Sequence, residues 1–461
     1  MWRSKYSSLP SLRTGIILYT FLSVALLFVP LFNILGYEFS AAFSLAGSLV
    51  AGFITIGMHK KDTEKGLPSI LLSATLVNEL LLLIPFAIIS VAALFIENCA
   101  YLEGLLYFLL YPCVTVLIAV SLAGFVLAAN VRHARTWFCG LWLLCAAYHA
   151  AVAYFNPALF SYWWAVGYFP GFQYDMTMRI TGTLLLARAG NLCMAALLLT
   201  SAWLLVRTGK ERALMRIVAA SQDVVNLGAH SVIFGALLML NIAAFTFRCE
   251  LGLERTHEFI TRELDGRIET EHFAFFYKHN TLSEDQRRWI ENRSEYFYSY
   301  FTQYLPQPDS SVIKVFLYSN PDEKKYLLGS RSTSITKPWV REIHMGVDEF
   351  DGTFEHELVH VLCAPYGMPV VNASFSIGLE EGTAVALTAM ENGSGDKLDK
   401  NAVGILHYLP ANSFAHVFSP AGFIYGNVDA NYAVAGSFVK YLITKFGAAY
   451  LQRAFAHADF K

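Results

Sequence analysis

Charged side chains are scarce in this sequence. Of its 461 residues only 15% are Asp, Glu, Lys or Arg and 55% are hydrophobic, whereas ordinary soluble domains carry about 25% charged residues. The net charge is -2 and there is no long basic run, which argues against a nucleic-acid partner. The seven cysteines show no CxxC spacing, so neither a zinc ribbon nor a dense disulfide framework is indicated. A lipid bilayer is therefore the expected surrounding for part of the chain.

The charges that are present lie unevenly along the chain. Before about residue 250, long apolar runs are separated by short charged clusters, and after it the sequence is rich in Glu, Arg, Lys and Asp. We therefore expect a transmembrane helical region at 1–250 and an extracytoplasmic domain at 270–461. A juxtamembrane linker at 251–269 is expected to join them.

Seven apolar runs in the first part have about the length of a membrane-spanning helix, which needs about 20 mainly apolar residues. The second run is rich in Gly and Ala and the fifth is short, so the expected number of spans is about seven. The first run lacks a small-residue cleavage site, so we expect it to be a retained span rather than a signal peptide. The runs are 15–35, 39–58, 68–95, 105–129, 137–155, 180–206 and 227–247.

Basic residues recur in every second connection between these runs. They precede the first run and follow the second, fourth and sixth, whereas the intervening connections hold Glu38, Glu97, Glu103 and an aromatic stretch at 160–174. Because cytoplasmic loops are enriched in Lys and Arg, the N-terminus is expected in the cytoplasm and everything after residue 248 outside it. This pattern predicts a multi-pass protein of a cell membrane and agrees with a bacterial inner membrane.

Two ionisable residues, Glu79 and Arg188, fall inside apolar runs. At a rise of about 1.5 Å per residue both lie near mid-depth of a bilayer. An isolated charge is unfavourable there, so we expect the two to pair. Such a pair would hold two helices together or form part of a polar path.

The second part has the pattern of a mixed α+β domain. Strands are expected at 272–278, 312–318 and 340–346, and a long helix is expected from Ser283 to about Tyr304. A polar turn at 348–352 leads into a helical segment with two His residues four positions apart.

That segment contains the pattern His356-Glu357-x-x-His360. On a helix, residues four apart are about 40° from one another, so both imidazoles project from one face and can bind a single zinc ion. Glu357 is turned by about 100° from His356, which suits a general base rather than a metal ligand. Apolar residues line the opposite side, so the helix can bury that side and present the other to a cleft.

A second segment about twenty residues later, Glu-Glu-Gly-Thr-Ala at 380–384, argues against a chance surface helix. Together the two segments resemble the gluzincin metallopeptidases, the peptidase MA-like group, in which a Glu-Gly-x-Ala pattern on the next helix supplies the third zinc ligand. The resemblance implies that His356, His360 and Glu381 hold Zn²⁺. Glu380 is the alternative third ligand.

The resemblance has two further implications for the second part. It implies that the strand at 340–346 is an edge strand that binds extended substrate, and that a Tyr or His stabilises the oxyanion. Tyr432, at the start of a predicted helix at 432–446, is the candidate, and His407, His416 and Tyr425 are alternatives. A Tyr that merely packs at a helix start would give the same pattern. The sequence departs from the family in having no carboxylate four residues after Glu381, so no partner for the His side chains is evident.

These features predict a membrane-anchored zinc metallopeptidase that hydrolyses peptide bonds on the extracytoplasmic side, with Glu357 as general base. Its expected partners are a peptide or protein substrate and the lipid bilayer, and no partner protein is indicated. An intramembrane protease is disfavoured, because Asp348, Glu349 and Asp351 flank the motif. The alternative is a membrane transporter or sensor with a non-catalytic metallopeptidase-like outer domain, since seven spans exceed the needs of anchoring.

Overall fold

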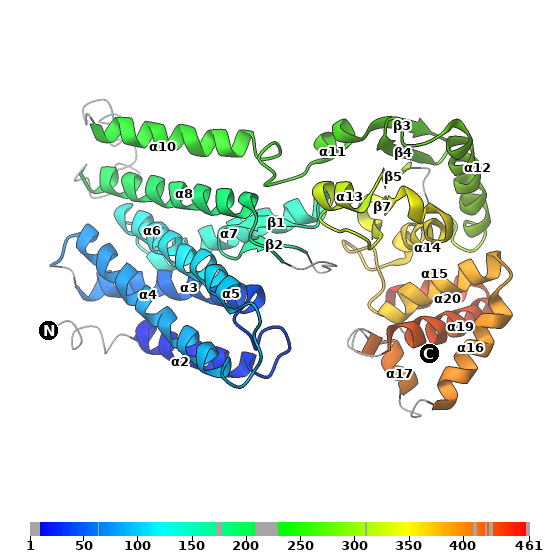
Figure 1. Ribbon diagram of the computed structural model, residues 1–461, viewed down its shortest axis with the longest axis horizontal. Coiled ribbons are helices and arrows are strands. Elements are labelled where there is room, and N and C mark those ends of the chain that lie inside the picture. The colour runs from blue at the N-terminus through cyan, green and yellow to red at the C-terminus, as the bar shows by residue number, and fades with distance from the viewer. Residues whose placement is uncertain are drawn as a thin grey trace. The chain divides into compact units, whose positions relative to one another are not determined.

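The computed structural model describes residues 10–62, 64–171, 178–207, 229–308, 311–408, 413–419, 422–423 and 427–457. It divides into an N-terminal unit, Met1–Thr256, and a C-terminal unit, His257–Lys461 (Figure 1). The segment 251–269, expected as a linker, contains helix α11 (His257–Leu264) and strand β3 (Asp265–Glu269). Strand β3 is hydrogen-bonded to the next strand, so the C-terminal unit begins at residue 257 rather than 270.

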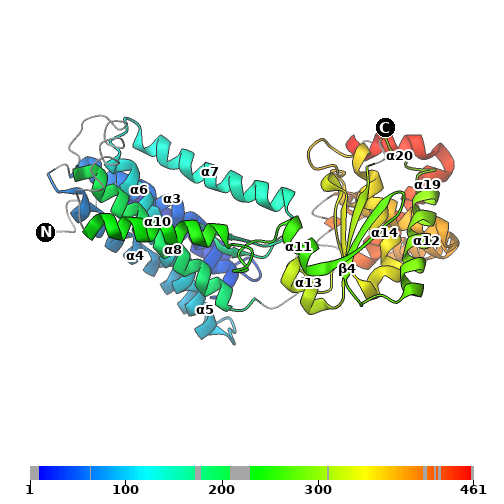
Figure 2. The same cartoon turned by 90° about the horizontal axis from the view of Figure 1, so that it is seen from above.

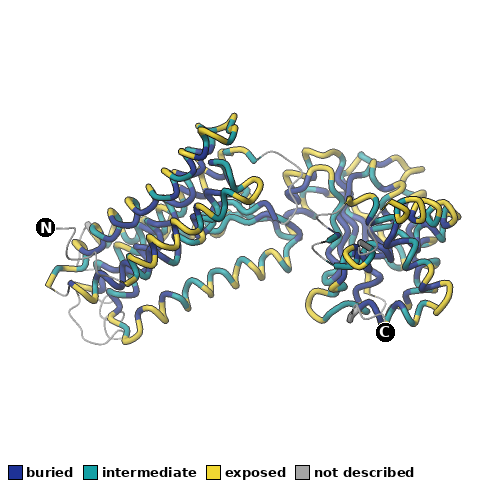
Figure 3. The backbone as a smooth tube through the Cα atoms, turned by 90° about the horizontal axis from the view of Figure 1, so that it is seen from below, coloured by how far each residue is buried: buried dark blue, intermediate teal, exposed yellow. Residues whose placement is uncertain are grey.

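Apolar helices make up most of the N-terminal unit, together with a small hairpin of β1 (Ser161–Trp163) and β2 (Gly167–Phe169). Helix α6 packs against α3, α4 and α8, and most of its residues are buried. Helix α7, in contrast, has few buried residues (Figure 3). The helices are α2 (Pro10–Leu26), α3 (Tyr37–Lys61), α4 (Leu67–Ala92), α5 (Tyr101–Phe108), α6 (Val114–Ala128), α7 (Ala134–Phe155), α8 (Gly182–Arg207) and α10 (Ala229–Thr246).

Five helical segments are long and apolar enough to cross a membrane, with α5 and α6 counted as one, which indicates a membrane protein. The expectation of about seven spans is not met within the described residues, because α2 and α10 are shorter apolar helices. Helix α2 has 17 residues, a length of about 26 Å against a hydrocarbon core of about 30 Å. It ends at Leu26, four residues before Pro30. Helix α10 adjoins residues 208–228, which lie outside the described part.

Arg188 and Glu79 do not form the expected ion pair in the described part of the chain. The guanidinium of Arg188 is buried and donates four hydrogen bonds, three of which join α8 to other segments. Glu79 lies instead beside Cys113, with which it forms a hydrogen bond. The acceptors of Arg188 are Trp164 O at 3.0 Å, Asn191 Oδ1 at 3.0 Å, Thr115 Oγ1 at 3.2 Å and Tyr111 O at 3.3 Å.

A five-stranded sheet with the order β3-β4-β5-β7-β6 is the centre of the C-terminal unit. Strands β4, β5 and β7 are mutually parallel, and β3 and β6 run antiparallel at the two edges. The three strands expected from the sequence are confirmed as β4, β5 and β7. The placement of the third was wrong, because the short strand β6 pairs with β7 and takes the edge position. The bounds are β4 (Phe273–Lys278), β5 (Ile313–Tyr318), β6 (Ile335–Lys337) and β7 (Glu342–Gly346).

Two helices, α12 (Glu284–Phe301) and α14 (Phe350–Cys363), cover the apolar face of this sheet (Figure 2). Phe354 of α14 packs against Phe273 of β4 and Phe297 of α12. Ser283 caps α12 through a reciprocal capping box with Gln286, which confirms the expected helix start. The packing fixes the apolar side of α14 and leaves its other side free for the His residues.

Helix α13 contacts strands β5 and β7, whereas the helices that follow α14 in the chain form a layer next to it (Figure 1). Helix α15 packs against α14 and against α19, and Gly382 permits the second contact. A Cβ at Gly382 would lie only 2.8 Å from the backbone oxygen of Ala435 in α19. This close approach brings the start of α19 near the acidic segment of α15. The further helices are α13 (Pro321–Leu327), α15 (Ile377–Glu391), α16 (Gly395–Tyr408), α17 (Ser413–Val417), α19 (Val428–Phe446) and α20 (Ala448–His457).

Candidate metal centre

Helix α14 has a kink immediately before the His motif. Asp351 and Gly352 have non-helical backbone angles, and the φ of Gly352 is 96°. This left-handed conformation is readily adopted by glycine but strained for other residues. The regular helix therefore begins after Gly352, as the polar turn predicted, and its following turns carry His356 and His360.

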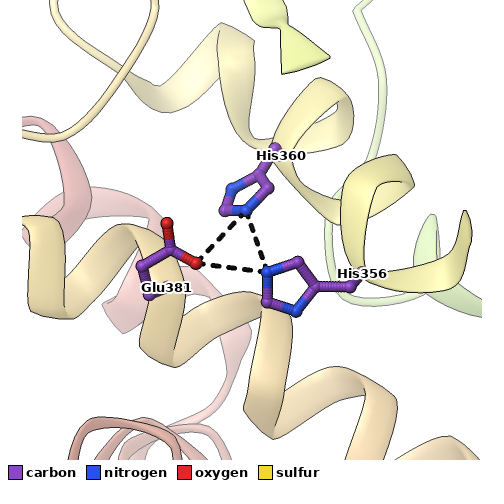
Figure 4. A group of neighbouring side chains, drawn as sticks. All are labelled: His356, His360 and Glu381. Carbon is purple, nitrogen blue, oxygen red and sulfur yellow. Dashed lines mark hydrogen bonds and ion pairs between the residues drawn. The ribbon is translucent and has the colours of Figure 1, made fainter. Parts of the chain in front are cut away.

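His356 and His360 project from one face of α14 toward Glu381 of α15 (Figure 4). The Nε2 atom of His356 lies 3.1 Å from Glu381 Oε2 and 3.2 Å from His360 Nε2, and the third side of the triangle is 3.5 Å. Three ligand atoms at about 2.0–2.1 Å from a tetrahedral zinc ion would be about 3.3 Å apart. The donor set, two imidazoles and one carboxylate, is also one that zinc takes. The residues present therefore fit a zinc ion.

Glu380, the alternative third ligand, faces away from this triangle. Its Oε2 accepts a hydrogen bond from the backbone nitrogen of Ser374 at 2.7 Å. Its Oε1 lies 3.5 Å from Nδ1 of His360, the ring nitrogen opposite the cluster. Carboxylates commonly hold metal-ligating His residues in this way. The sequence showed no sign of this partner, because the family pattern predicts such a carboxylate four residues after Glu381, whereas here it directly precedes Glu381.

Burial and the neighbouring charged groups shift the pKa values of the side chains in this cluster in opposite directions. Burial alone would lower the pKa of His360, but hydrogen bonds with Glu380 and Glu381 and nearby carboxylate charges raise it well above the usual value. Burial alone would raise the pKa of Glu381, but hydrogen bonds with His356 and His360 hold it well below the usual range. Glu381 is therefore ionised at neutral pH. The carboxylates that favour a proton on His360 favour any cation at the same place.

Glu357 points to a different neighbour from the two His residues. Its Oε2 accepts a hydrogen bond from Thr336 Oγ1 of β6 at 2.6 Å. It is outside the triangle of possible ligands, yet its charge still raises the pKa of both His360 and Tyr432. The structure thus places Glu357 beside the cluster and in contact with the edge strand. Thr336 carried no signal in the sequence, because a three-residue strand gives no periodic pattern.

Tyr432, in the first turns of α19, lies close to the cluster. Its ring centroid is 6.3 Å from that of His356. Burial, then the charge of Glu381 and a hydrogen bond with it, raise the pKa of Tyr432, so its hydroxyl keeps its proton. Of the alternatives, His407 and His416 are exposed and outside the cluster, and Tyr425 lies outside the described residues.

The sequence was also compared with known proteins. It matched no model of a protein family, and no curated protein matched it. The candidate centre therefore rests on its own residues and geometry.

Proposed function

We propose that this protein is a membrane-anchored zinc metallopeptidase in which His356, His360 and Glu381 hold the zinc ion. The observation that carries the proposal is the convergence of these three donors from two helices, at mutual distances of 3.1, 3.2 and 3.5 Å. A zinc ion there would polarise a peptide carbonyl and increase the acidity of water. No other group of three His, Cys, Asp or Glu residues with such spacing occurs in the described part of the chain.

Glu357 is the general base of the proposed reaction. It stands next to the ligands without belonging to them, so its carboxylate can take a proton from the attacking water and pass it to the leaving amine. Thr336 binds Oε2 of this carboxylate and so fixes its orientation. Tyr432 is the proposed donor of a hydrogen bond to the oxyanion. Glu380 orients His360 through Nδ1.

An extended peptide is the substrate form that the sheet edge favours. Strand β6 pairs with β7 on one side, and no further strand of the described residues pairs with its other side. Such an edge offers backbone groups to an added strand. Because Thr336 belongs to β6 and contacts Glu357, a peptide added there would run past the proposed base. This role belongs to β6 rather than to the strand at 340–346.

The N-terminal unit supplies the membrane anchor in this proposal. Its apolar helices suit a bilayer, and the basic connections predict a cytoplasmic N-terminus. The C-terminal unit would then act on the extracytoplasmic side of a cell membrane, such as a bacterial inner membrane. The bilayer and a peptide or protein substrate are the partners required.

Metal content and peptide hydrolysis of the full-length protein in detergent test the proposal. Zinc per chain is measured by plasma mass spectrometry, and cleavage of a peptide library by mass spectrometry of the products. Glu357→Gln should retain zinc and lose at least about 100-fold in hydrolysis, because the base is removed and the ligands are kept. Glu355→Gln is the matched control, since Glu355 is a buried carboxylate on the same helix outside the cluster, and should retain activity.

Two results would contradict the proposal. Full-length protein that binds no zinc would remove the metal assignment. Protein that binds zinc stoichiometrically but cleaves no peptide would favour the alternative, a membrane transporter or sensor whose outer domain is not catalytic.

A further inference from the structure

A cavity of about 450 Å³ lies in the N-terminal unit, lined by residues of α7, α8, α10 and the β1 strand. Its size is within the range of ligand-binding pockets, about 300–1,000 Å³. Most of its lining is apolar, and the lining residues of α7 and α10 belong to the C-terminal halves of these helices. The cavity therefore lies toward one end of the helices, where α7 and α10 end and α8 begins.

The separation of α7 from α8 and α10 explains this space. Helix α7 packs against α3 and α6, whereas α8 packs against α6 and α10. Only 6% of an 18-residue apolar stretch of α7 is buried. Figures 2 and 3 show this helix apart from its neighbours along most of its length. In a bilayer this space would be filled by hydrocarbon rather than by water.

Two polar side chains in the cavity wall lack hydrogen-bond partners for some of their atoms. His149 of α7 has ring contacts with Tyr148 and Trp163, but neither ring nitrogen has a hydrogen bond to the described residues. Asn191 of α8 accepts a hydrogen bond from Arg188, while its amide nitrogen donates none within the described part. Polar groups in spanning helices are unfavourable unless they are satisfied. A ligand with acceptor atoms would satisfy both.

The cavity lining includes a cation, Arg248, which is ion-paired with Glu254. Arg248, which follows α10, donates from Nε to Glu254 at 2.9 Å and from Nη1 to Phe245 O at 3.0 Å. Its Nη2 has no hydrogen bond to the described residues, and its side chain is 29% exposed. An Arg with free N–H groups is well suited to a phosphate group.

We propose that this cavity binds part of one phospholipid molecule, with the phosphate at Arg248 and the upper part of one acyl chain between α7 and α8, while the rest of the lipid lies in the bilayer. The ester carbonyls accept hydrogen bonds from His149 and Asn191. His149 is six residues from the end of α7 and Asn191 nine from the start of α8, which places them about 9 and 14 Å from the helix ends. Polar groups at two depths match a phospholipid, whereas a fatty acid has a single polar end.

Gly190 allows the cavity to be filled without disturbing the helices. It lines the cavity, and a Cβ built on it meets no atom within 4 Å. Gly190→Phe therefore places a ring in the space that the lipid would occupy. Gly235→Phe is the matched control, because a Cβ on Gly235 of α10 also meets nothing within 4 Å and this residue is outside the cavity lining.

The experiment is native mass spectrometry of the full-length protein, titrated with palmitoyl-oleoyl phosphatidylglycerol after detergent purification. Wild-type protein and Gly235→Phe should retain one lipid per chain that survives collisional activation. Gly190→Phe should weaken this binding by at least about 10-fold, and Arg248→Gln by a smaller factor. A parallel titration with oleate distinguishes a phospholipid from a free fatty acid.

Equal lipid retention by all four proteins would overturn the proposal, since only lipid on the outer surface of the helices would then be present. Oleate binding in preference to phosphatidylglycerol would overturn the phosphate assignment. Size-exclusion chromatography and helical circular dichroism confirm the fold of each variant. If Gly190→Phe fails to fold, the titration of Arg248→Gln tests the proposal, because this change affects a partly exposed side chain. Unchanged affinity of that variant for phosphatidylglycerol would then overturn the proposed lipid site.

Discussion

In the C-terminal unit, His356, His360 and Glu381 converge from two adjacent helices, whereas in the N-terminal unit Glu79 and Arg188 remain separate. The two His residues share one face of α14, and α15 packs directly against that helix. Glu79 is on α4 and Arg188 on α8, and α6 packs against both of these helices and so comes between them. The ionisable groups thus meet where their helices pack directly against each other. An equal depth in the bilayer is not enough to bring two such groups into contact.

Removal of Glu381 should have the largest effect on the convergent site. Glu381→Ala in the full-length protein should lower zinc affinity by more than about 100-fold, because one of three ligands is gone. Loss of a residue that only hydrogen-bonds to a ligand typically lowers metal affinity by about 10–100-fold. Competition with a chelator of known affinity measures it. Glu391→Ala, at the other end of the same helix, is the control.

The opposite order of zinc affinities for the Glu380→Ala and Glu381→Ala variants would contradict this ligand assignment. If Glu380→Ala lost zinc while Glu381→Ala kept it, Glu380 would be the ligand. The triangle of donor atoms would then have been assigned to the wrong residue.

Removal of the negative charge of Glu380 should have a smaller effect on the same site. Glu380→Gln should lower zinc affinity by about 10–100-fold, since His360 loses the carboxylate that holds its Nδ1 side. The chelator competition that measures Glu381→Ala also measures this variant. Unchanged affinity would show that the 3.5 Å contact does not orient the imidazole.

The parts of the site that could be predicted from the sequence are those set by local geometry. His356 and His360 are four residues apart on one helix, so their common face follows from the helical period alone. Glu381 was predicted from its sequence neighbours, which resemble a known pattern. Thr336 could not be predicted, because it reaches Glu357 through the pairing of β6 with β7. The same holds for the edge position of β6.

A proline in an apolar run did not by itself predict the length of the helix. The run at 15–35 was expected to form one span, but α2 ends at Leu26, four residues before Pro30, whereas α4 continues through Pro85. The partner of Arg188 was also beyond prediction. Most of its acceptors are backbone oxygens and a hydroxyl group, which charge patterns in a sequence do not reveal.

Loss of the Thr336 hydroxyl should reduce turnover more mildly. Thr336→Val keeps the shape of the side chain but removes the hydrogen bond to Glu357, so kcat should fall about 10-fold, with KM nearly unchanged. Steady-state kinetics on a cleaved peptide measures both constants. Thr336→Ser should restore kcat, which a purely structural role of the methyl group would not allow. Equal loss in Thr336→Val and Thr336→Ser would contradict a positioning role.

The smallest effect is expected for the coupling between Glu79 and Arg188. Each single change, Glu79→Gln or Arg188→Gln, should destabilise the protein, because Cys113 or the four acceptors of Arg188 lose a partner. Since the two residues share none of these partners, the double variant should equal the sum of the singles within about 0.5 kcal/mol. The free energy of unfolding in detergent, measured for all four proteins, gives this coupling. A coupling above about 1 kcal/mol would mean that the two charges interact across α6, and the contrast between the two units would then fail.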